Sequence, residues 1–510
     1  MHQPYYKNLL TQETTVPWVR LHGLKDYLDM VEILKSYPAI RQNFNLVPSL
    51  VEQIEDYTSR SIKDKFLELS YKPAASLSAE EKEFIRENFF SINKERVIAL
   101  FPRYYELYFK QAKGLELTTQ DYLDLQVWFN LAWTDPSFRQ GIPELRNAVD
   151  QGRFFSEEEK RAVLDKQTEI LENILPAYKE FRDSGQIEVT VSPYYHPILP
   201  LLYNTKIAKE ANTKTLLPKT NFSWPVDVQA QIEQAVQFYQ SRFGSPPAGM
   251  WPSEESVAER ILPFLIEAGI KWLVADEAIL FKSLKKKKRK VSLIYQPYLL
   301  QRKEGNLNIV FRDRNLSDLI GFVYHNLTAA AAVKDFMQHL QDIAVFFKNQ
   351  DTLVTVAMDG ENAWEYYTHD GGDFLKLLYQ NLSAAKFVQT TTISEYLKNH
   401  PTQAQIKHLA CGSWIYANFD KWMNNPYKTR AWEWLVEARK ALEDQRPTTN
   451  DQRLKMAWKQ IYICEGSDWF WWYGEDPAGG FDALFRMHLC NFYTLIGKEA
   501  PPYLKKPLTT

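Results

Sequence analysis

The chain has 510 residues, 45% of them hydrophobic, so it can bury a large core and hold more than one folding unit. Lysine and arginine (61) nearly balance aspartate and glutamate (63), leaving a net charge of −2. This balance gives no electrostatic case for binding nucleic acid or an anionic membrane surface.

The cysteines and the N-terminal residues exclude further classes of protein. Three cysteines without a Cys-x-x-Cys pair argue against a disulfide framework and a zinc–cysteine site. The opening residues, MHQPYY, lack the basic and apolar regions of a signal peptide. No apolar run reaches the roughly 18 residues of a membrane span. We therefore predict a cytoplasmic protein that binds neither nucleic acid nor membranes.

The aromatic content is high, with 15 Trp, 28 Tyr and 29 Phe residues. Aromatic rings often line carbohydrate clefts, because the apolar face of a sugar stacks on them. A large core that simply uses aromatic side chains is the alternative explanation, and composition alone leaves both open.

In chain order, hydrophobic periodicity predicts strands that alternate with helices. The predicted helices cover residues 24–37, 79–109, 157–184, 226–243, 256–268 and 329–348. The predicted strands cover residues 42–47, 187–191, 272–275, 307–311, 353–358 and 387–392. This alternation is typical of a parallel α/β barrel, whose active site lies just after the strands.

Two stretches depart from the alternating pattern. Residues 49–184 contain too much helix for one crossover, which predicts an α-helical insertion. From about residue 395 only helix and loop are expected. We therefore predict a catalytic barrel over residues 1–395 and a C-terminal helical domain over residues 396–510 that contributes to the cleft.

Two carboxylate-bearing stretches are candidates for the chemistry. GMWPSE (residues 249–254) places Trp251 and Glu254 at a tight connection before a helix that Ser253 would start. VTVAMDGEN (residues 354–362) is an apolar, β-prone run that ends in Asp359 and Glu361. Two carboxylates at strand ends are what glycosidic chemistry requires, one as acid and one as nucleophile or base.

The basic run KKKKRK (residues 285–290) has two possible interpretations. It could be a nuclear signal or a nucleic-acid patch. Because it falls in a polar connection between two predicted strands of a neutral chain, we interpret it as a solvated loop.

Six short motifs, in this order and spacing, resemble glycoside hydrolase family 57, and within it the α-amylase/amylopullulanase-like group. They are HQP (2–4), YYHPILP (194–200), GMWPSE (249–254), MDGEN (358–362), GSW (412–414) and EGSDWFWWYG (465–474). The resemblance implies an incomplete seven-stranded (β/α) barrel with a helical C-terminal domain. It also implies retaining chemistry on α-1,4 and perhaps α-1,6 links of α-glucans, without a metal or cofactor. By motif position, Glu254 would be the nucleophile and Asp359 the general acid/base.

The resemblance also suggests residues that bind the sugar. His2 and His196 would bind hydroxyl groups beside the cleaved bond. Further candidates are Trp251, Asp276, Arg312, Asp313, Glu361, Trp414, Asp468 and Trp469. Each also has a structural explanation: ion pairing for the residues after strands, helix capping or orientation of Asp359 for Glu361, and core packing for the aromatic C-terminal segment. Glu255 is expected to compensate the dipole of the following helix.

The N-terminus departs from the family pattern, because the first motif normally ends an apolar barrel strand and here His2 is the second residue. We expect that first strand to be missing from this chain. Its two neighbours would then have unpaired edges, and His2 would lie on a mobile terminus. We also expect the upstream reading frame to encode five to ten apolar residues.

Three alternatives remain at this point. The same two carboxylates would serve an α-glucanotransferase or branching enzyme if a sugar hydroxyl replaced water. A zinc enzyme on a related barrel would need an Asp two residues from a His near the first strand, where this chain has His-Gln-Pro. A non-catalytic glycan-binding protein would be expected to have lost one carboxylate, and both are present.

Overall fold

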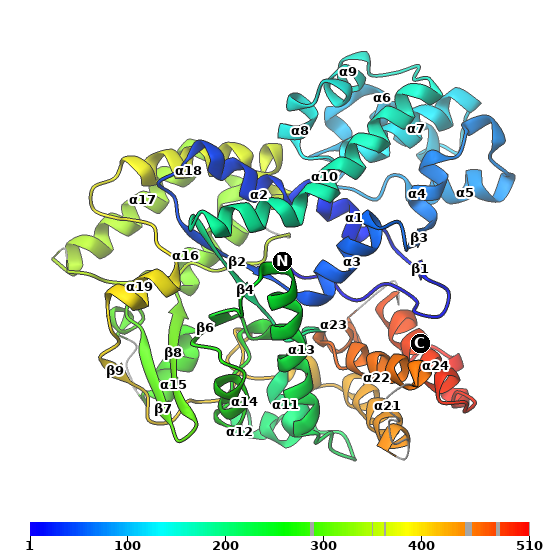
Figure 1. The fold of residues 1–510 in the computed structure, drawn as a ribbon. Coiled ribbons are helices and arrows are strands. Elements are labelled where there is room, and N and C mark those ends of the chain that lie inside the picture. The colour runs from blue at the N-terminus through cyan, green and yellow to red at the C-terminus, as the bar shows by residue number, and fades with distance from the viewer. Residues whose placement is uncertain (286–289, 349, 362–363, 444–450, 476–479, 509–510) are drawn as a thin grey trace.

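The computed structural model describes residues 1–285, 290–348, 350–361, 364–443, 451–475 and 480–508. Its central element is a seven-stranded sheet surrounded by helices (Figure 1). In spatial order the strands are β2 (Gln42–Leu46), β4 (Ile187–Val191), β5 (Gly249–Met250), β6 (Trp272–Asp276), β8 (Gly305–Arg312), β7 (Tyr298–Arg302) and β9 (Ala404–Gln405). Two further short strands, β1 (Glu13–Thr14) and β3 (Lys63–Asp64), pair with each other.

Five of the strands, β2, β4, β5, β6 and β8, are parallel neighbours in chain order. Their carboxyl ends therefore meet at one end of the sheet, where parallel barrels carry their active sites. This arrangement confirms the predicted fold class, an incomplete (β/α)7 barrel with helical additions. The four longer predicted strands among these five are confirmed within a few residues, whereas β7 and β9 were not predicted. The prediction of only helix and loop after residue 395 is corrected by β9.

Two predicted strands, residues 353–358 and 387–392, are irregular in the structure. The first pairs with the sheet through a parallel bridge between Arg312 and Thr355. Side chains supply the hydrogen bonds that a strand ladder would make. Ser317 Oγ accepts from the amide of Ala357 at 3.1 Å, and Arg312 Nε donates to the carbonyl of Ala357 at 2.8 Å. The second segment contacts the start of β2 through Thr390, whose hydroxyl accepts from Arg41 N at 2.8 Å.

The segment between β2 and β4 is almost entirely helical, and most of its helices gather at one corner of the molecule (Figure 1). They are α3 (Pro48–Thr58), α4 (Lys65–Tyr71), α5 (Ala79–Asn88), α6 (Pro102–Ala112), α7 (Thr119–Ala132), α8 (Pro136–Gly141), α9 (Pro143–Gln151) and α10 (Glu157–Asp183). Capping boxes start three of them, at Ser78, Thr118 and Ser156. The single helix predicted over residues 79–109 is wrong: α5 ends at Asn88, and after a connection rich in turns Pro102 forces extended backbone on Phe101 and starts α6.

The other helices lie between the strands or follow the sheet. In chain order they are α1 (Trp18–His22), α2 (Asp29–Glu32), α11 (Leu199–Tyr203), α12 (Ala208–Ala211), α13 (Pro225–Phe243), α14 (Leu262–Glu267), α15 (Glu277–Ser283), α16 (Arg314–Asp318), α17 (Ala329–Phe346), α18 (Gly372–Ala384) and α19 (Ile393–Asn399). The helix predicted over residues 24–37 is broken into a π-helical turn (Gly23–Tyr27), α2 and a 3₁₀ turn (Ile33–Ser36).

The C-terminal part of the chain forms α20 (Asp420–Met423), α21 (Pro426–Glu443), α22 (Gln452–Cys464), α23 (Ser467–Trp472) and α24 (Gly480–Leu495). One hydrophobic cluster includes residues from Tyr5 to Leu504 and so joins these helices to the barrel. The division into domains at residue 395 stays a prediction. In the described residues no helix is both long and apolar enough to cross a bilayer.

The first residues of the chain lie against β2. Met1 N donates to Asn45 O at 2.8 Å and Val47 N donates to Met1 O at 3.3 Å, as in a parallel ladder. Met1 also packs on Gly360, where a Cβ would lie 2.7 Å from Met1 Cγ. The expectation that His2 is mobile is therefore corrected, because the amine and the carbonyl of Met1, directly before it, are both hydrogen-bonded. Among the described strands β2 is still the edge of the sheet.

Candidate active site

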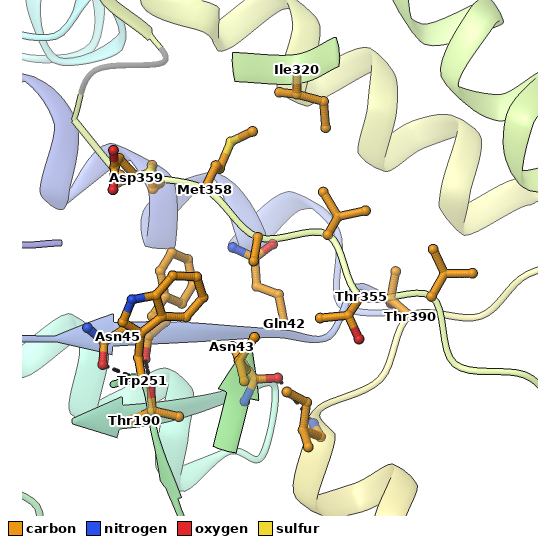
Figure 2. Close-up of a pocket in the computed structure, with 18 of the residues that line it drawn as sticks. Gln42, Asn43, Asn45, Thr190, Trp251, Ile320, Thr355, Met358, Asp359 and Thr390 are labelled. Atoms are coloured by element: carbon orange, nitrogen blue, oxygen red, sulfur yellow. Dashed lines mark hydrogen bonds between the residues drawn. The ribbon is translucent and has the colours of Figure 1, made fainter. Parts of the chain in front are cut away.

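A cavity of about 1780 Å³ lies at the carboxyl end of the sheet, between β2 and the irregular segment 353–361. Figure 2 shows Asn43 and Asn45 of β2 on one side of it and Thr355, Met358 and Asp359 on the other. Eight of the twelve predicted site residues line it: His2, His196, Trp251, Glu254, Asp359, Glu361, Trp414 and Asp468. The fold thus brings together residues from all six sequence motifs. Asn362 of the fourth motif and residues 286–289 of the basic run lie outside the described residues.

Glu254 is held by an unusual backbone conformation. The predicted helix start at Ser253 is wrong: Ser253–Glu255 form a 3₁₀ turn in which Glu254 (φ 57°) and Glu255 (φ 51°) are both left-handed. This conformation is costly for residues with a Cβ, and such strain gathers at functional sites. The turn directs Glu254 into the cavity, where Trp414 Nε1 donates to its Oε2 at 2.7 Å.

Glu255 points the other way. Its side chain is fully buried, and among the described residues neither of its carboxyl oxygens has a hydrogen-bond partner. Burial raises the pKa of Glu255 well above its usual range; the charge of Arg312 opposes this shift and that of Asp276 adds to it. Glu255 is therefore a neutral acid in the wall behind the site, and the expectation that it compensates a helix dipole is wrong.

Both predicted catalytic carboxyls have raised pKa values. Burial and then the charge of Asp359 raise the pKa of Glu254 to about 8. Burial and then the charge of Glu361 raise the pKa of Asp359. Because both carboxyls face one cavity, the second proton leaves the pair only at high pH. The raised pKa values let the site keep a protonated carboxyl at a higher pH than ordinary acidic side chains would, which acid–nucleophile chemistry needs.

Two histidines form a stacked pair beside these carboxyls. The rings of His2 and His196 lie 3.7 Å apart between centroids, at an interplanar angle of 22°. Burial lowers the pKa of His2, but the charge of Asp468 and its hydrogen bond at 3.0 Å outweigh burial and raise the pKa. Burial and the charge of His2 depress the pKa of His196. His2 therefore holds a proton to higher pH than the His196 on which it stacks, and His196 Nδ1 lies 3.0 Å from Ser467 Oγ.

Glu361 and the tryptophans complete the lining. Glu361 Oε1 accepts from the amide of His2 at 2.7 Å, so it fixes the N-terminal residues against the cavity. Trp251 and Trp414 meet edge to face at 5.7 Å, and the guanidinium of Arg312 lies 5.3 Å from the Trp414 ring. These rings form a rigid aromatic wall next to Glu254.

Four predicted site residues do not line the cavity: Asp276, Arg312, Asp313 and Trp469. Asp276 caps α15 and pairs with Arg312 at 3.7 Å and with Arg314. Asp313 caps α16 and accepts from Tyr295 Oη at 2.8 Å. Trp469 is buried and donates to Ile463 O at 2.8 Å. Ion pairing, helix capping and core packing account for these residues.

Sequence reasoning missed other residues that line the cavity, among them Gln3, Tyr6, Ser467, Trp471 and Trp472. A helical signal was present for the two tryptophans. Asp468, Trp471 and Trp472 follow the i, i+3, i+4 spacing of one helix face, and α23 turns that face to the cavity. Trp469, which was chosen instead, lies on the opposite face. No group of three or more His, Cys, Asp or Glu side chains in the described residues is placed to hold a metal ion.

Comparison with known proteins identifies one protein family and several solved structures with a similar fold. The model of glycosyl hydrolase family 57 matches residues 1–408. An α-amylase from Dictyoglomus thermophilum is 28% identical over 115 residues, which are 22% of this chain and only 14% of that protein.

Among solved structures, a family 57 branching enzyme from Pyrococcus horikoshii matches with a TM-score of 0.63 at 15% identity, over 99% of this chain and 91% of the other. An α-amylase from Thermotoga maritima matches with a TM-score of 0.61 at 14% identity, over 97% and 91% of the two chains. At such identities the likeness shows the fold alone. Because the family model covers most of the sequence, the chain belongs to glycosyl hydrolase family 57.

Proposed function

We propose that the protein is a retaining glycosidase of α-glucans in which Glu254 is the nucleophile and Asp359 the general acid/base. Family 57 contains enzymes that act on α-glucans, and the relatives described above include amylases and a branching enzyme. The observation that carries the proposal is the pair itself: two carboxyls from distant motifs face one cavity, and both have raised pKa values, that of Glu254 partly through the charge of Asp359.

In the first step, Asp359 gives its proton to the glycosidic oxygen as the bond breaks. The ionised carboxylate of Glu254 attacks the anomeric carbon and forms a covalent glycosyl-enzyme. The hydrogen bond from Trp414 lowers the pKa of Glu254 and so favours the ionised form that attacks, against the burial and charge that raise this pKa to about 8.

In the second step, Asp359 is ionised and takes a proton from water, which attacks the same carbon and releases the sugar with its original configuration. The imidazolium of His2 donates to sugar hydroxyls and remains oriented by Asp468. His196, neutral and fixed by Ser467, binds a neighbouring hydroxyl. Trp251 and Trp414 stack on the apolar face of the sugar.

Two substitutions test the assignment. Glu254→Gln and Asp359→Asn should each lower reducing-sugar release from maltoheptaose at least about 1000-fold, because each removes a group that changes bonding in the transition state. The matched control is Glu259→Gln, whose carboxyl forms a salt bridge with Arg302 and does not line the cavity. Normal turnover by either site variant would reject the assignment. Proton NMR of the first product should show the α-anomer, and a β-anomer would reject retention.

Transfer to another sugar is the second candidate function. It is favoured by the aromatic walls around the carboxyls, since rings that bind an acceptor sugar also displace water. Chromatography after incubation with maltoheptaose distinguishes the two outcomes. Longer products at constant reducing ends indicate transfer, and shorter products with new reducing ends indicate hydrolysis. Incubation with amylose and pullulan tests the α-1,4 and α-1,6 specificity of an amylase or amylopullulanase. A cytoplasmic location remains part of the proposal.

A further inference from the structure

A second hollow lies outside the active site, between α13 and α22, and is called the α13–α22 groove below. It has a volume of about 580 Å³, within the range of small-ligand sites. The residues that matter for its chemistry are Tyr194, Gln234, Gln237, Phe238, Trp458 and Tyr462. Both helices run side by side below the centre of the molecule in Figure 1.

The groove is lined by aromatic rings from α22, α13 and residues 194–195 and by amides from α13. Trp458 and Tyr462 are one helical turn apart on α22, with centroids 5.7 Å apart. Tyr194 and Phe238 meet edge to face at 5.3 Å. Gln234 and Gln237 add neutral donors and acceptors from α13. Among the described residues that line the groove there is no aliphatic side chain, whereas a groove for a protein helix is floored by aliphatic groups.

Ion pairs hold the rings in place. Arg439 lies 4.6 Å from the Trp458 ring and is bound to Asp227 at 2.7 and 3.0 Å. Arg242 lies 3.8 Å from the Phe238 ring and is bound to Glu55 at 3.0 and 2.8 Å. Each ring is thus backed by a neutralised cation and is ordered before any ligand arrives, which reduces the entropic cost of binding.

The charges at the base of the groove are also neutralised. Glu52 accepts from Tyr194 Oη at 3.0 Å and forms a salt bridge with Lys459. The charge of Lys459 and its hydrogen bond oppose burial and lower the pKa of Glu52, so the pair stays ionised and balanced. The exposed Lys455 is the one further charged side chain among the described residues that line the groove, so most of the lining is neutral. A neutral, hydroxyl-rich chain is matched, because rings stack on it and amides bind its hydroxyls.

We propose that the α13–α22 groove is a second binding site for a neutral α-glucan chain. The identity of the sugar as an α-glucan rests on the proposed function. Tyr194 and Tyr195 line the groove, and the next residue, His196, lines the active-site cavity. One side of the loop that contains Tyr194 and His196 therefore holds the polymer, and the other side contacts the reacting sugar. Binding in the groove raises the local concentration of substrate chains at the active site.

The test measures glycogen binding by affinity electrophoresis of full-length protein carrying Glu254→Gln, so that the substrate is not consumed. Adding Trp458→Ala should weaken retention about tenfold, and adding Gln237→Ala about threefold, in line with one lost ring contact and one lost hydrogen bond. The control is Phe346→Ala, which removes a ring that is 70% exposed on α17 and lies outside both hollows. It should change retention by less than about twofold.

Unchanged retention in the Gln237→Ala and Trp458→Ala proteins would overturn the proposal that the groove binds an α-glucan. Because Gln237 is exposed, its variant tests the groove even if Trp458→Ala fails to fold. In the otherwise unmodified enzyme, Trp458→Ala should reduce turnover of glycogen but leave turnover of maltoheptaose unchanged. If neither sugar is turned over but retention still depends on Trp458, the proposed function fails and the groove stands. If both glycogen and maltoheptaose are turned over and retention does not depend on Trp458, the groove is not a glucan-binding site and the proposed function is retained.

Discussion

Glu254 and Glu255 are adjacent in the sequence but have different roles, one in the cavity and one in the wall behind it. Both have left-handed backbone and both have raised pKa values. Glu254 faces the cavity and receives a hydrogen bond from Trp414, whereas Glu255 is enclosed without a partner among the described residues. The strained turn is what turns the first side chain inward and the second into the wall.

The Trp414 hydrogen bond can be tested by Trp414→Phe. The change removes a donor to ionised Glu254, so the pKa of Glu254 rises further and less of the enzyme carries the ionised nucleophile. We expect kcat to fall about 10- to 100-fold, the range of a lost hydrogen bond to a charged group, and the acidic limb of the pH profile to shift upward. Trp471→Phe, in the same cavity, is the control and should change kcat less than about threefold. Equal effects would show that ring packing, and not the hydrogen bond, matters.

The raised pKa of Glu254 also predicts how stability depends on pH. Its folded pKa of about 8 lies above the ordinary value of 4.5, so between these pH values the folded chain holds a proton that the unfolded chain has lost. This group therefore makes stability fall as pH rises through that window, by at most about 1.4 kcal/mol per pH unit.

Glu254→Gln should remove this contribution, so that the free energy of unfolding, measured in urea from pH 5 to 8, depends less steeply on pH than in the parent. Glu267→Gln, on the exposed end of α14, should leave the slope as it is. A parent-like slope in Glu254→Gln would mean that the pKa of Glu254 is not raised.

At the scale of elements, buried charges tie the irregular segments to the helices. Lys25, in the π-helical turn, binds Asp26 at 3.0 Å and also forms a salt bridge with Asp370. Asp370 lies in the 3₁₀ turn Thr368–Gly371, where it has a left-handed φ of 57°. This turn starts α18, soon after the segment that carries Asp359. The salt bridge therefore anchors a part of the chain that has few backbone ladders.

Lys25→Met should lower the free energy of unfolding by about 3–5 kcal/mol, because it leaves the carboxylates of Asp26 and Asp370 buried without their cation. Urea unfolding at pH 7 measures the loss. Lys35→Met is the matched control, since Lys35 is largely exposed and pairs with Glu32 at the surface, and it should cost less than about 1 kcal/mol. Similar losses in the two variants would contradict the anchoring role.

At the scale of the whole molecule, the site is assembled from both ends of the chain and its middle. His2, Glu254 and Asp468 face one cavity although the sequence separates them widely. The loop around His196 pairs with the C-terminal part through a bridge between Pro197 and Gly466, and Ser467 N donates to His196 O at 3.1 Å. The C-terminal helices are therefore part of the wall of the site.

The sequence by itself determined the long elements and the composition of the site. β4 and α10 were predicted almost to the residue, because each is a continuous periodic run with clear boundaries. The two carboxylates were found because their motifs are short and contiguous. Trp471 was missed because the choice within its motif depends on which face of α23 meets the cavity.

Only the tertiary structure decided which residues near strand ends reach the cavity. Asp276 and Asp313 follow strands just as Asp359 does, yet helices α15 and α16 begin directly after them and use their carboxyls as caps. Segment 353–358 reads as a strand but lacks a ladder, because a strand needs a neighbouring backbone that local sequence cannot supply. Protonation is non-local for the same reason: the pKa of Glu254 depends on burial and on Asp359, and both arise only when the barrel is assembled.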